Sequence, residues 1–237
     1  MKAFRAVARA LAGTLAAFLT GWGLWAAVTW LQYGHPPRSN RPDPILSRML
    51  PEPEVMERHE RIVHASPARA FQAVRSFRLE DSEVVGAIFR ARELMFGLPR
   101  ADRGTSRPFL EQAAAMGWST LDSIPGREVA YGAVCQPWHG EVRFEGLPAA
   151  RFVAFRDPGY AKIAWAIAAD SLGPDRVRLR TETRVAATDP DSRRKFRRYW
   201  SQFSPGIVLI RLELLRVVAH EAERPESGAP GVSRARR

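Results

Sequence analysis

The sequence has few of the residues that form disulfide bonds or structural metal sites. Cys135 is its only cysteine, which excludes an intramolecular disulfide and a cysteine-rich metal site. It contains no glycine-rich phosphate loop and no Gly-x-Ser-x-Gly nucleophile motif. His59 and His64 are five residues apart, so a straight strand would direct them to opposite faces, which does not suit a shared metal. We therefore expect no metal and no cofactor, and we interpret Cys135 as a buried, unreactive thiol.

Lysine is also scarce. Among 36 basic residues, only Lys2, Lys162 and Lys195 are lysines, and the formal net charge is +11. Such a positive charge usually suggests nucleic acid or an anionic membrane as a binding partner. The arginines are scattered along the chain, however, and their excess beside abundant alanine is typical of genome composition. We therefore expect no nucleic-acid partner.

One long stretch lacks charge altogether. It runs from Ala10 to Gly34 and follows a basic N-terminal flank, residues 1–9. About 22 apolar residues in a helix span about 33 Å, enough for a hydrocarbon core of about 30 Å. Three tryptophans and Tyr33 gather in its C-terminal half, where an interfacial aromatic belt would lie. This pattern predicts one uncleaved transmembrane helix over 10–34; a cleaved signal peptide and a buried soluble helix are the alternatives.

The charges beside this segment barely decide its orientation. Three basic residues and the free amino group precede it, and three arginines follow it by position 48. The positive-inside rule favours slightly a cytoplasmic N-terminus, with the globular part outside the cytoplasm. We expect a single-pass protein of the cell membrane and leave the side of the globular part open.

The rest of the chain divides by composition. Residues 35–53 hold six prolines, a density that disfavours helix and predicts an extended, semi-rigid linker. Residues 54–223 carry the apolar patterns of a folded domain. Residues 224–237 are rich in Pro, Gly, Ser and Arg and predict a disordered tail.

The clearest pattern lies between Tyr160 and Trp200. Odd positions from Val177 to Val185 are apolar or threonine, while even positions from Arg176 to Arg184 are charged, which predicts a half-solvated antiparallel strand. An apolar strand precedes it across a Gly-Pro-Asp turn. A long helix then begins at Asp189-Pro190, and Ser204-Pro205-Gly206 should kink or break it.

In the N-terminal part of the domain, the sequence pattern predicts a strand followed by helices. The strand covers 55–65, Ser66 and Ser82 begin two helices, and a third is expected at 109–116. Turn signals then separate short segments, which indicates an antiparallel meander and not a βαβ alternation. Strands are expected at 118–124, 129–136, 140–145 and 151–155.

This order resembles the START-like superfamily, also called SRPBCC, which includes the Bet v 1-like proteins and polyketide cyclases. The resemblance rests on ERHERIVHASPARAFQAVRSF and on FRDPGYAKIAWAIAADSLGPDRVRLRTETRVAATDPDSRRKFRRYW, and it covers roughly Glu54 to Glu223. It implies an α+β helix-grip fold, with a curved antiparallel sheet wrapped around the C-terminal helix. It also implies an apolar cavity between sheet and helix, which in such proteins often holds a lipid or another hydrophobic ligand. The N-terminal anchor departs from the usual soluble form.

Aromatic residues gather in the predicted meander and the terminal helix. They would form either a packed core or, with a few hydroxyl groups, the lining of a small-molecule pocket. Glu182 lies on the charged face, where cross-strand pairing explains it, and no catalytic constellation stands out. The pocket interpretation predicts ligand contacts from Trp138, Phe155, Trp165, Thr181, Thr183, Tyr199 and Phe203.

The function expected from these patterns is non-catalytic binding of a hydrophobic small molecule or lipid by a membrane-anchored domain. Two alternatives stay open: an enzyme of the cyclase or hydratase type on the same fold, and a protein-interaction scaffold with a filled core. The basic run from Arg193 to Arg198 is either a solvated helix face or, on the cytoplasmic side, a contact for anionic headgroups.

Overall fold

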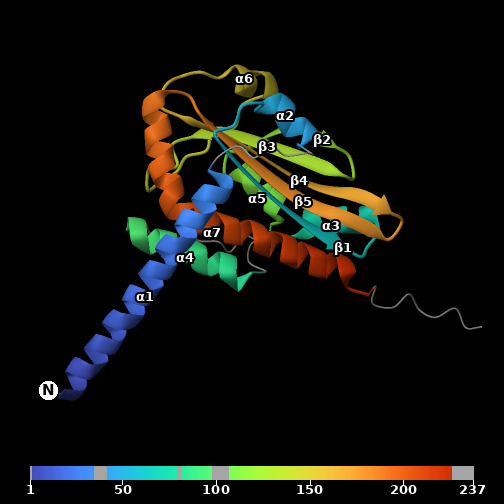
Figure 1. Ribbon diagram of the computed structural model, residues 1–237. Helices are drawn as coiled ribbons and strands as arrows, with labels where there is room; N and C mark the ends of the chain where they lie inside the picture. Colours follow the sequence, from blue (N-terminus) through green and yellow to red (C-terminus); the bar gives the residue numbers. More distant parts are fainter. Residues whose placement is uncertain (1, 35–41, 79–81, 98–106, 226–237) are drawn as a thin grey trace, which may run out of the picture.

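A five-stranded antiparallel sheet in the order β1-β5-β4-β3-β2 forms the centre of the computed structural model (Figure 1). The structure describes residues 2–34, 42–78, 82–97 and 107–225. Neighbouring strands pair antiparallel, as the meander pattern predicted. The strands are β1 (Val55–Val63), β2 (Ser119–Ile124), β3 (Glu128–Cys135), β4 (Ala161–Gly173) and β5 (Arg176–Ala187).

Helices surround this sheet, and the longest one ends the chain. The fold is therefore α+β with a sheet packed on a long C-terminal helix, as the sequence resemblance implied. The helices are α1 (Lys2–Tyr33), α2 (Pro44–Met49), α3 (Pro67–Ser76), α4 (Glu83–Phe96), α5 (Phe109–Ala115), α6 (Ala149–Ala154) and α7 (Pro190–Glu223).

The inner face of the sheet, defined as the face toward α3 and α7, carries the odd positions of β5, so the predicted alternation is confirmed. At one end of α7, Phe196 and Trp200 pack on Val55 and Val185. At the other end, a larger apolar cluster joins α3 and the last turns of α7 to Leu179 and its neighbours. These two clusters hold α7 against the sheet at both of its ends.

The outer face, defined as the opposite face, is not half-solvated as predicted. Arg180, Glu182 and Arg184 are buried there, although Arg176 is exposed. They lie under α2, whose N-cap residue Asp43 forms an ion pair with Arg180. Strand periodicity could not show this, because the covering segment comes from about 130 positions earlier in the chain.

The segment that covers the outer face belongs to the proline-rich residues 35–53. The expectation of an extended backbone is wrong for Pro44–Met49, which form α2. Proline at the first helical position loses no hydrogen bond, and Asp43 Oδ1 accepts a bond of 2.8 Å from the Leu46 amide. Ile45 and Leu46 are buried against the outer face of the sheet. Residues 35–41 lie outside the described residues.

Two predicted strands are absent from the described part of the chain. Residues 140–145 form no strand; only Glu145 makes an isolated bridge, to Val134. Residues 149–154 form α6, which lies on the outer face beside α2. There Lys162 of β4 donates to the Val153 carbonyl at 3.0 Å, near the end of α6. The predicted helix at 109–116 and the strands at 118–124 and 129–136 are confirmed as α5, β2 and β3.

Helix α7 bends near its middle but does not break. Pro205 lies inside the continuous helix Pro190–Glu223, and Figure 1 shows the orange and red halves running in different directions. Proline cannot donate the backbone hydrogen bond of a helix interior, which accounts for the bend. The bend lets both halves of α7 lie against a curved sheet.

Helix α1 docks against this bend with its C-terminal part. Thr29 and Ser204 share a hydrogen bond of 2.7 Å between their hydroxyls, and Trp22 Nε1 donates to the Gln202 carbonyl at 3.1 Å. Other residues of α1 stay exposed, among them Leu11 at 67% and Leu31 at 73%. Within the described residues, Arg9–Tyr33 is the one helical stretch long and apolar enough to cross a membrane. It fits a membrane anchor or a signal sequence.

Candidate functional site

A band of polar residues crosses the inner face between the two apolar clusters. We call it the inner polar band and define it as Glu57, His59, Thr181, Thr183 and Arg211. Glu57 lies opposite Thr183 and His59 lies opposite Thr181 in the pairing of β1 with β5. The exposed fractions of the four strand residues are 1% for Glu57, 8% for His59, 1% for Thr181 and 5% for Thr183.

Hydrogen bonds satisfy only part of this band. Glu57 Oε1 lies 2.9 Å from His59 Nε2, and Thr181 Oγ1 donates to the Ala166 carbonyl at 3.0 Å. Glu57 Oε2 and Thr183 Oγ1 have no hydrogen-bond partner among the described residues. Most buried polar atoms in proteins are paired, so two unpaired atoms on neighbouring strands are unusual.

Arg211 brings a positive charge to the same place from α7. Its guanidinium lies 5.3 Å from the centre of the Trp165 ring, and Trp165 lies opposite Thr183 in the pairing of β4 with β5. Protein atoms surround this side chain, although part of its surface reaches solvent. Burial lowers the pKa of Arg211, and the Glu57 carboxylate acts in the opposite direction. No carboxylate of the described residues forms an ion pair with Arg211, although Glu57 is near enough to act on its charge.

Aromatic rings close one side of the band. Trp165 stacks on Tyr131 with ring centres 4.8 Å apart, and Phe109 lies 5.4 Å from Trp165. Trp118 meets Trp165 edge to face at 6.1 Å. A ligand in the band would therefore have polar groups on the β1 side and aromatic surface on the β3 side.

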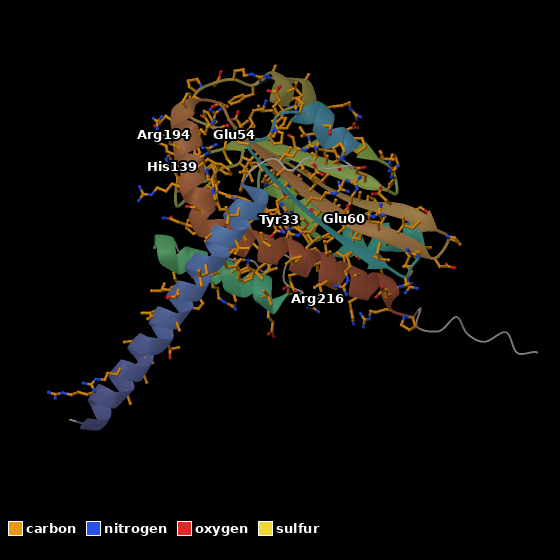
Figure 2. The ribbon with its side chains drawn as sticks, in the orientation of Figure 1. Tyr33, Glu54, Glu60, His139, Arg194 and Arg216 are labelled. Atoms are coloured by element: carbon orange, nitrogen blue, oxygen red, sulfur yellow. The ribbon has the colours of Figure 1, made fainter. Side chains whose placement is uncertain are left out.

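The end of α1 lies at the other side. Tyr33 packs edge to face on His59 with ring centres 5.3 Å apart. Figure 2 shows Tyr33 where the end of α1 meets β1. The predicted membrane segment thus ends in contact with the inner polar band.

The structure brings together three of the seven predicted ligand contacts. Trp165, Thr181 and Thr183 lie in or beside the inner polar band. Trp138 and Tyr199 pack around the apolar cluster of Val55 and Trp200, and Phe203 stacks on Tyr199 at 4.9 Å.

Phe155 lies apart from the other six. It packs with the outer-face cluster and meets Tyr160 edge to face at 5.5 Å. Since the sheet separates the two faces, Phe155 and Trp165 are not directed into one pocket. Ligand contact by the seven residues remains a prediction.

Sequence reasoning missed Glu57, considered His59 only as a metal ligand, and missed Arg211. A signal for the first two was present, because Glu57 and His59 share strand parity with Val55 and Val63, which are apolar. Charged residues on the apolar face of a strand are unusual and direct attention to buried chemistry. Arg211 interrupts the apolar run of the second half of α7 in the same way.

Metal and thiol chemistry find no support here. Across the ranges that the structure describes, no group of three or more His, Cys, Asp or Glu residues could hold a metal ion. Cys135 is 1% exposed, and burial raises the pKa of its thiol to about 12. The interpretation of Cys135 as a buried residue is confirmed, and its thiol stays protonated at neutral pH.

No protein-family model and no curated protein sequence matches the chain. Similar solved structures include the Zhui aromatase/cyclase from Streptomyces sp. R1128, at 15% identity and a TM-score of 0.28, covering 75% of this chain and 98% of that one. A START superfamily protein from Mycobacterium smegmatis is 16% identical with a TM-score of 0.20, covering 67% of this chain and 98% of that one. Ara h 8.0201 is 8% identical with a TM-score of 0.20, and the match covers 70% of this chain and 96% of that one.

Proposed function

Starting from a START-like α+β fold whose sheet packs on a long C-terminal helix, we propose that this chain binds a hydrophobic molecule at the inner polar band. The ligand is a lipid or another small molecule with an apolar body and a polar group. It is bound without chemical change, and α1 anchors the binding domain in a membrane.

One observation supports this proposal above the others: buried polar atoms without partners lie between two apolar clusters. An unsatisfied buried donor or acceptor costs about 1–3 kcal/mol, so a fold that keeps Glu57 Oε2 and Thr183 Oγ1 unpaired favours a polar group that meets them. Arg211 adds a cation without a carboxylate partner among the described residues. This combination suits a carbonyl, carboxylate or phosphate oxygen near Arg211 and a hydroxyl group near Glu57.

The apolar body of the ligand would lie along the clusters that flank the band. Phe196 and Trp200 cover one side, and Leu214 and Val218 cover the other. Contact between Tyr33 and His59 puts the membrane segment beside the band. A ligand drawn from the bilayer would therefore have a short path to it.

The test is native mass spectrometry of the full chain, extracted from membranes in mild detergent, with lipid analysis of the same sample. We expect one hydrophobic molecule per chain in the wild type and at least tenfold lower occupancy in Arg211→Gln. Arg216→Gln is the matched control, because Arg216 lies on the same helix, is exposed and pairs with Glu213 at 2.8 Å. It should retain the wild-type occupancy. Wild-type chains that carry no molecule and take up none from a lipid extract would contradict the proposal and favour the scaffold with a filled core.

A second candidate is an enzyme of the cyclase or hydratase type. The distance of 2.9 Å between Glu57 Oε1 and His59 Nε2 favours it, because a carboxylate that orients an imidazole is a common general-base arrangement. His59→Gln would then abolish turnover of a co-purified molecule while its binding persists. If no conversion of that molecule is detected in the wild type, the binding function stands alone.

A further inference from the structure

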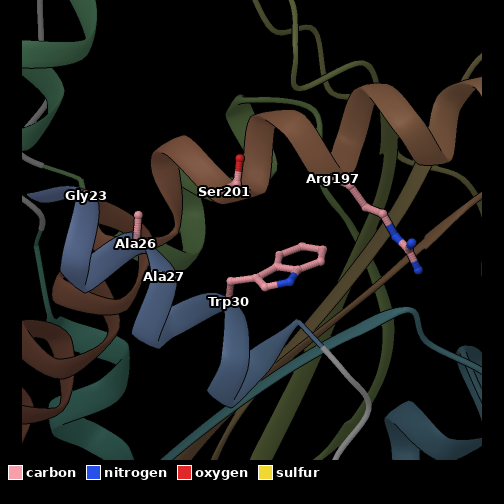
Figure 3. Close-up of a pocket in the computed structure, with 6 residues that line it drawn as sticks. All are labelled: Gly23, Ala26, Ala27, Trp30, Arg197 and Ser201. Atoms are coloured by element: carbon pink, nitrogen blue, oxygen red, sulfur yellow. The ribbon is translucent and has the colours of Figure 1, made fainter.

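A groove runs between α1 and α7, away from the inner polar band. Its volume is about 410 Å³. Figure 3 shows that α1 lines it with Trp30 and small residues, while α7 contributes Arg197 and Ser201. The small residues are Gly23, Ala26 and Ala27. The groove thus has an apolar wall made of one indole ring and three small residues, and a polar wall with one cation.

Arg197 differs from two of the cations near it, Arg193 and Lys195. Arg193 pairs with Glu54 at 2.8 Å, and Lys195 pairs with Asp191 at 2.7 Å. Arg197 has no carboxylate partner among the described residues, and its guanidinium lies 6.0 Å from the centre of the Trp30 ring. A guanidinium held beside an aromatic ring and left without an acid suits a phosphate group.

The position of the groove along α1 can be compared with the thickness of a bilayer. Gly23 lies 14 residues after Arg9, the start of the membrane-length stretch, so the groove begins about 21 Å along the helix. Trp30 lies about 32 Å along, where a hydrocarbon core of about 30 Å gives way to headgroups. If α1 spans a bilayer, the groove therefore crosses the boundary between acyl chains and headgroups.

We propose that this groove binds a phospholipid of the surrounding bilayer. Its phosphate meets Arg197, and the Ser201 oxygen accepts a bond from a headgroup hydroxyl. The part of an acyl chain next to the headgroup lies along Gly23, Ala26 and Ala27. Because Arg197 has no carboxylate partner among the described residues, anionic lipids are preferred over zwitterionic ones. The inference rests on the proposed membrane insertion of α1 and not on the ligand of the inner polar band.

The test uses the full chain reconstituted in vesicles of phosphatidylcholine, with and without phosphatidylglycerol, and then measured by native mass spectrometry. We expect one retained phosphatidylglycerol per wild-type chain. Arg197→Gln should lower its occupancy about tenfold, and Ala27→Leu, which fills the groove without changing charge, should do the same. Arg198→Gln removes the same charge from an exposed neighbour outside the groove lining and should change occupancy less than twofold.

Three outcomes would overturn the inference: no retained phospholipid, equal losses in Arg197→Gln and Arg198→Gln, or a mature chain whose mass lacks the α1 segment. The same spectra separate this inference from the proposed function. Arg211→Gln should release only the molecule at the inner polar band, and Arg197→Gln should release only the phospholipid. Either binding event can therefore fail while the other persists.

Discussion

The two faces of the sheet bury charge in opposite ways. On the outer face, Arg180 meets Asp43, lies 3.0 Å from Glu128 and lies 2.6 Å from Asp170. On the inner face, Glu57 leaves one oxygen without a partner among the described residues, and no acid pairs with Arg211. A buried cation that meets three acids stabilises the fold, whereas a cation without an acid partner is available to a ligand.

The same contrast appears in how each face is covered. Arg184 donates to the Leu50 carbonyl and the Ser47 hydroxyl, both at 3.1 Å, so its charge fixes α2 on the outer face. Glu182 bridges Arg184 and Arg58 at 2.7 and 2.8 Å. The polar residues of the inner face hold α7 less directly, because the apolar clusters at its two ends do so. Mutations should therefore affect stability on one face and binding on the other.

The largest effect is expected on the outer face. Arg180→Met leaves Asp43, Glu128 and Asp170 without their shared cation, and breaking a buried ion pair in this way costs about 3–5 kcal/mol of unfolding free energy. Denaturant unfolding of the full chain in detergent would measure it. Arg178→Met is the control: Arg178 is partly exposed and lies 3.3 Å from Glu60, so its loss should cost less than about 1 kcal/mol. Similar costs for the two variants would remove the proposed difference between buried and exposed pairs.

A pH dependence of stability should come from the same cluster. Burial and the neighbouring Asp43 raise the pKa of Glu128 from 4.5 to about 7. While ionised, Glu128 Oε1 has no donor among the described residues; once protonated, it can share its proton with Asp43, whose own pKa is lowered. A raised carboxyl pKa stabilises the fold below the unfolded value and loses that contribution as pH rises through the folded one.

The free energy of unfolding should therefore fall by about 1–3 kcal/mol between about pH 5 and pH 8. Asp43 works in the opposite sense, but only where pH falls below its ordinary value of 3.8. Glu128→Gln keeps the shape and cannot titrate, so its stability should stay level over that window. A slope in the variant equal to that of the wild type would assign the effect to other groups.

On the inner face, Glu57→Gln should separate binding from stability. The change keeps the shape of the side chain and removes a buried charge that is only partly satisfied, so we expect unfolding free energy to change by less than about 1 kcal/mol. Occupancy by the co-purified molecule should fall about tenfold. Glu60→Gln, on the outer face of the same strand, is the control and should leave occupancy unchanged. A stability loss in Glu57→Gln as large as that in Arg180→Met would show that Glu57 is structural.

The smallest effect should distinguish two threonines of β5. Thr181→Val removes the bond to the Ala166 carbonyl and should cost about 1 kcal/mol. Thr183→Val removes a hydroxyl without a partner among the described residues and should not lower stability. Lipid occupancy should respond in the reverse order. Equal effects on both readouts would mean that Thr183 has no special part in binding.

The sequence predicted those parts of the architecture that depend on residues close together in the chain. Alternation fixed which residues of β5 meet α7, and Pro190 with its N-cap Asp189 fixed the start of that helix. The bend at Pro205 follows from a missing backbone donor and was predictable for the same reason. The prediction erred at α2 and α6, which are only six residues long and owe their helices to the sheet they cover.

The candidate site was harder to predict because its members are distant in the chain. Thr183 and Trp165 were found as polar and aromatic residues of paired strands. Glu57 and Arg211 come from an edge strand and a helix more than 150 positions apart, and no local pattern links them. Only the pairing of β1 with β5 and the path of α7 bring them to one band.

The sequence by itself therefore determined the strand periodicity, the terminal helix with its bend, and one apolar segment of membrane length, because each depends on residues close together in the chain. The tertiary structure alone decided which charges are paired. Asp43 reaches Arg180 across 137 positions, whereas Glu57 and Thr183 meet across a strand pair and keep unpaired atoms. Pairing is a matter of three-dimensional proximity, and a strand pattern specifies only the face on which a charge lies.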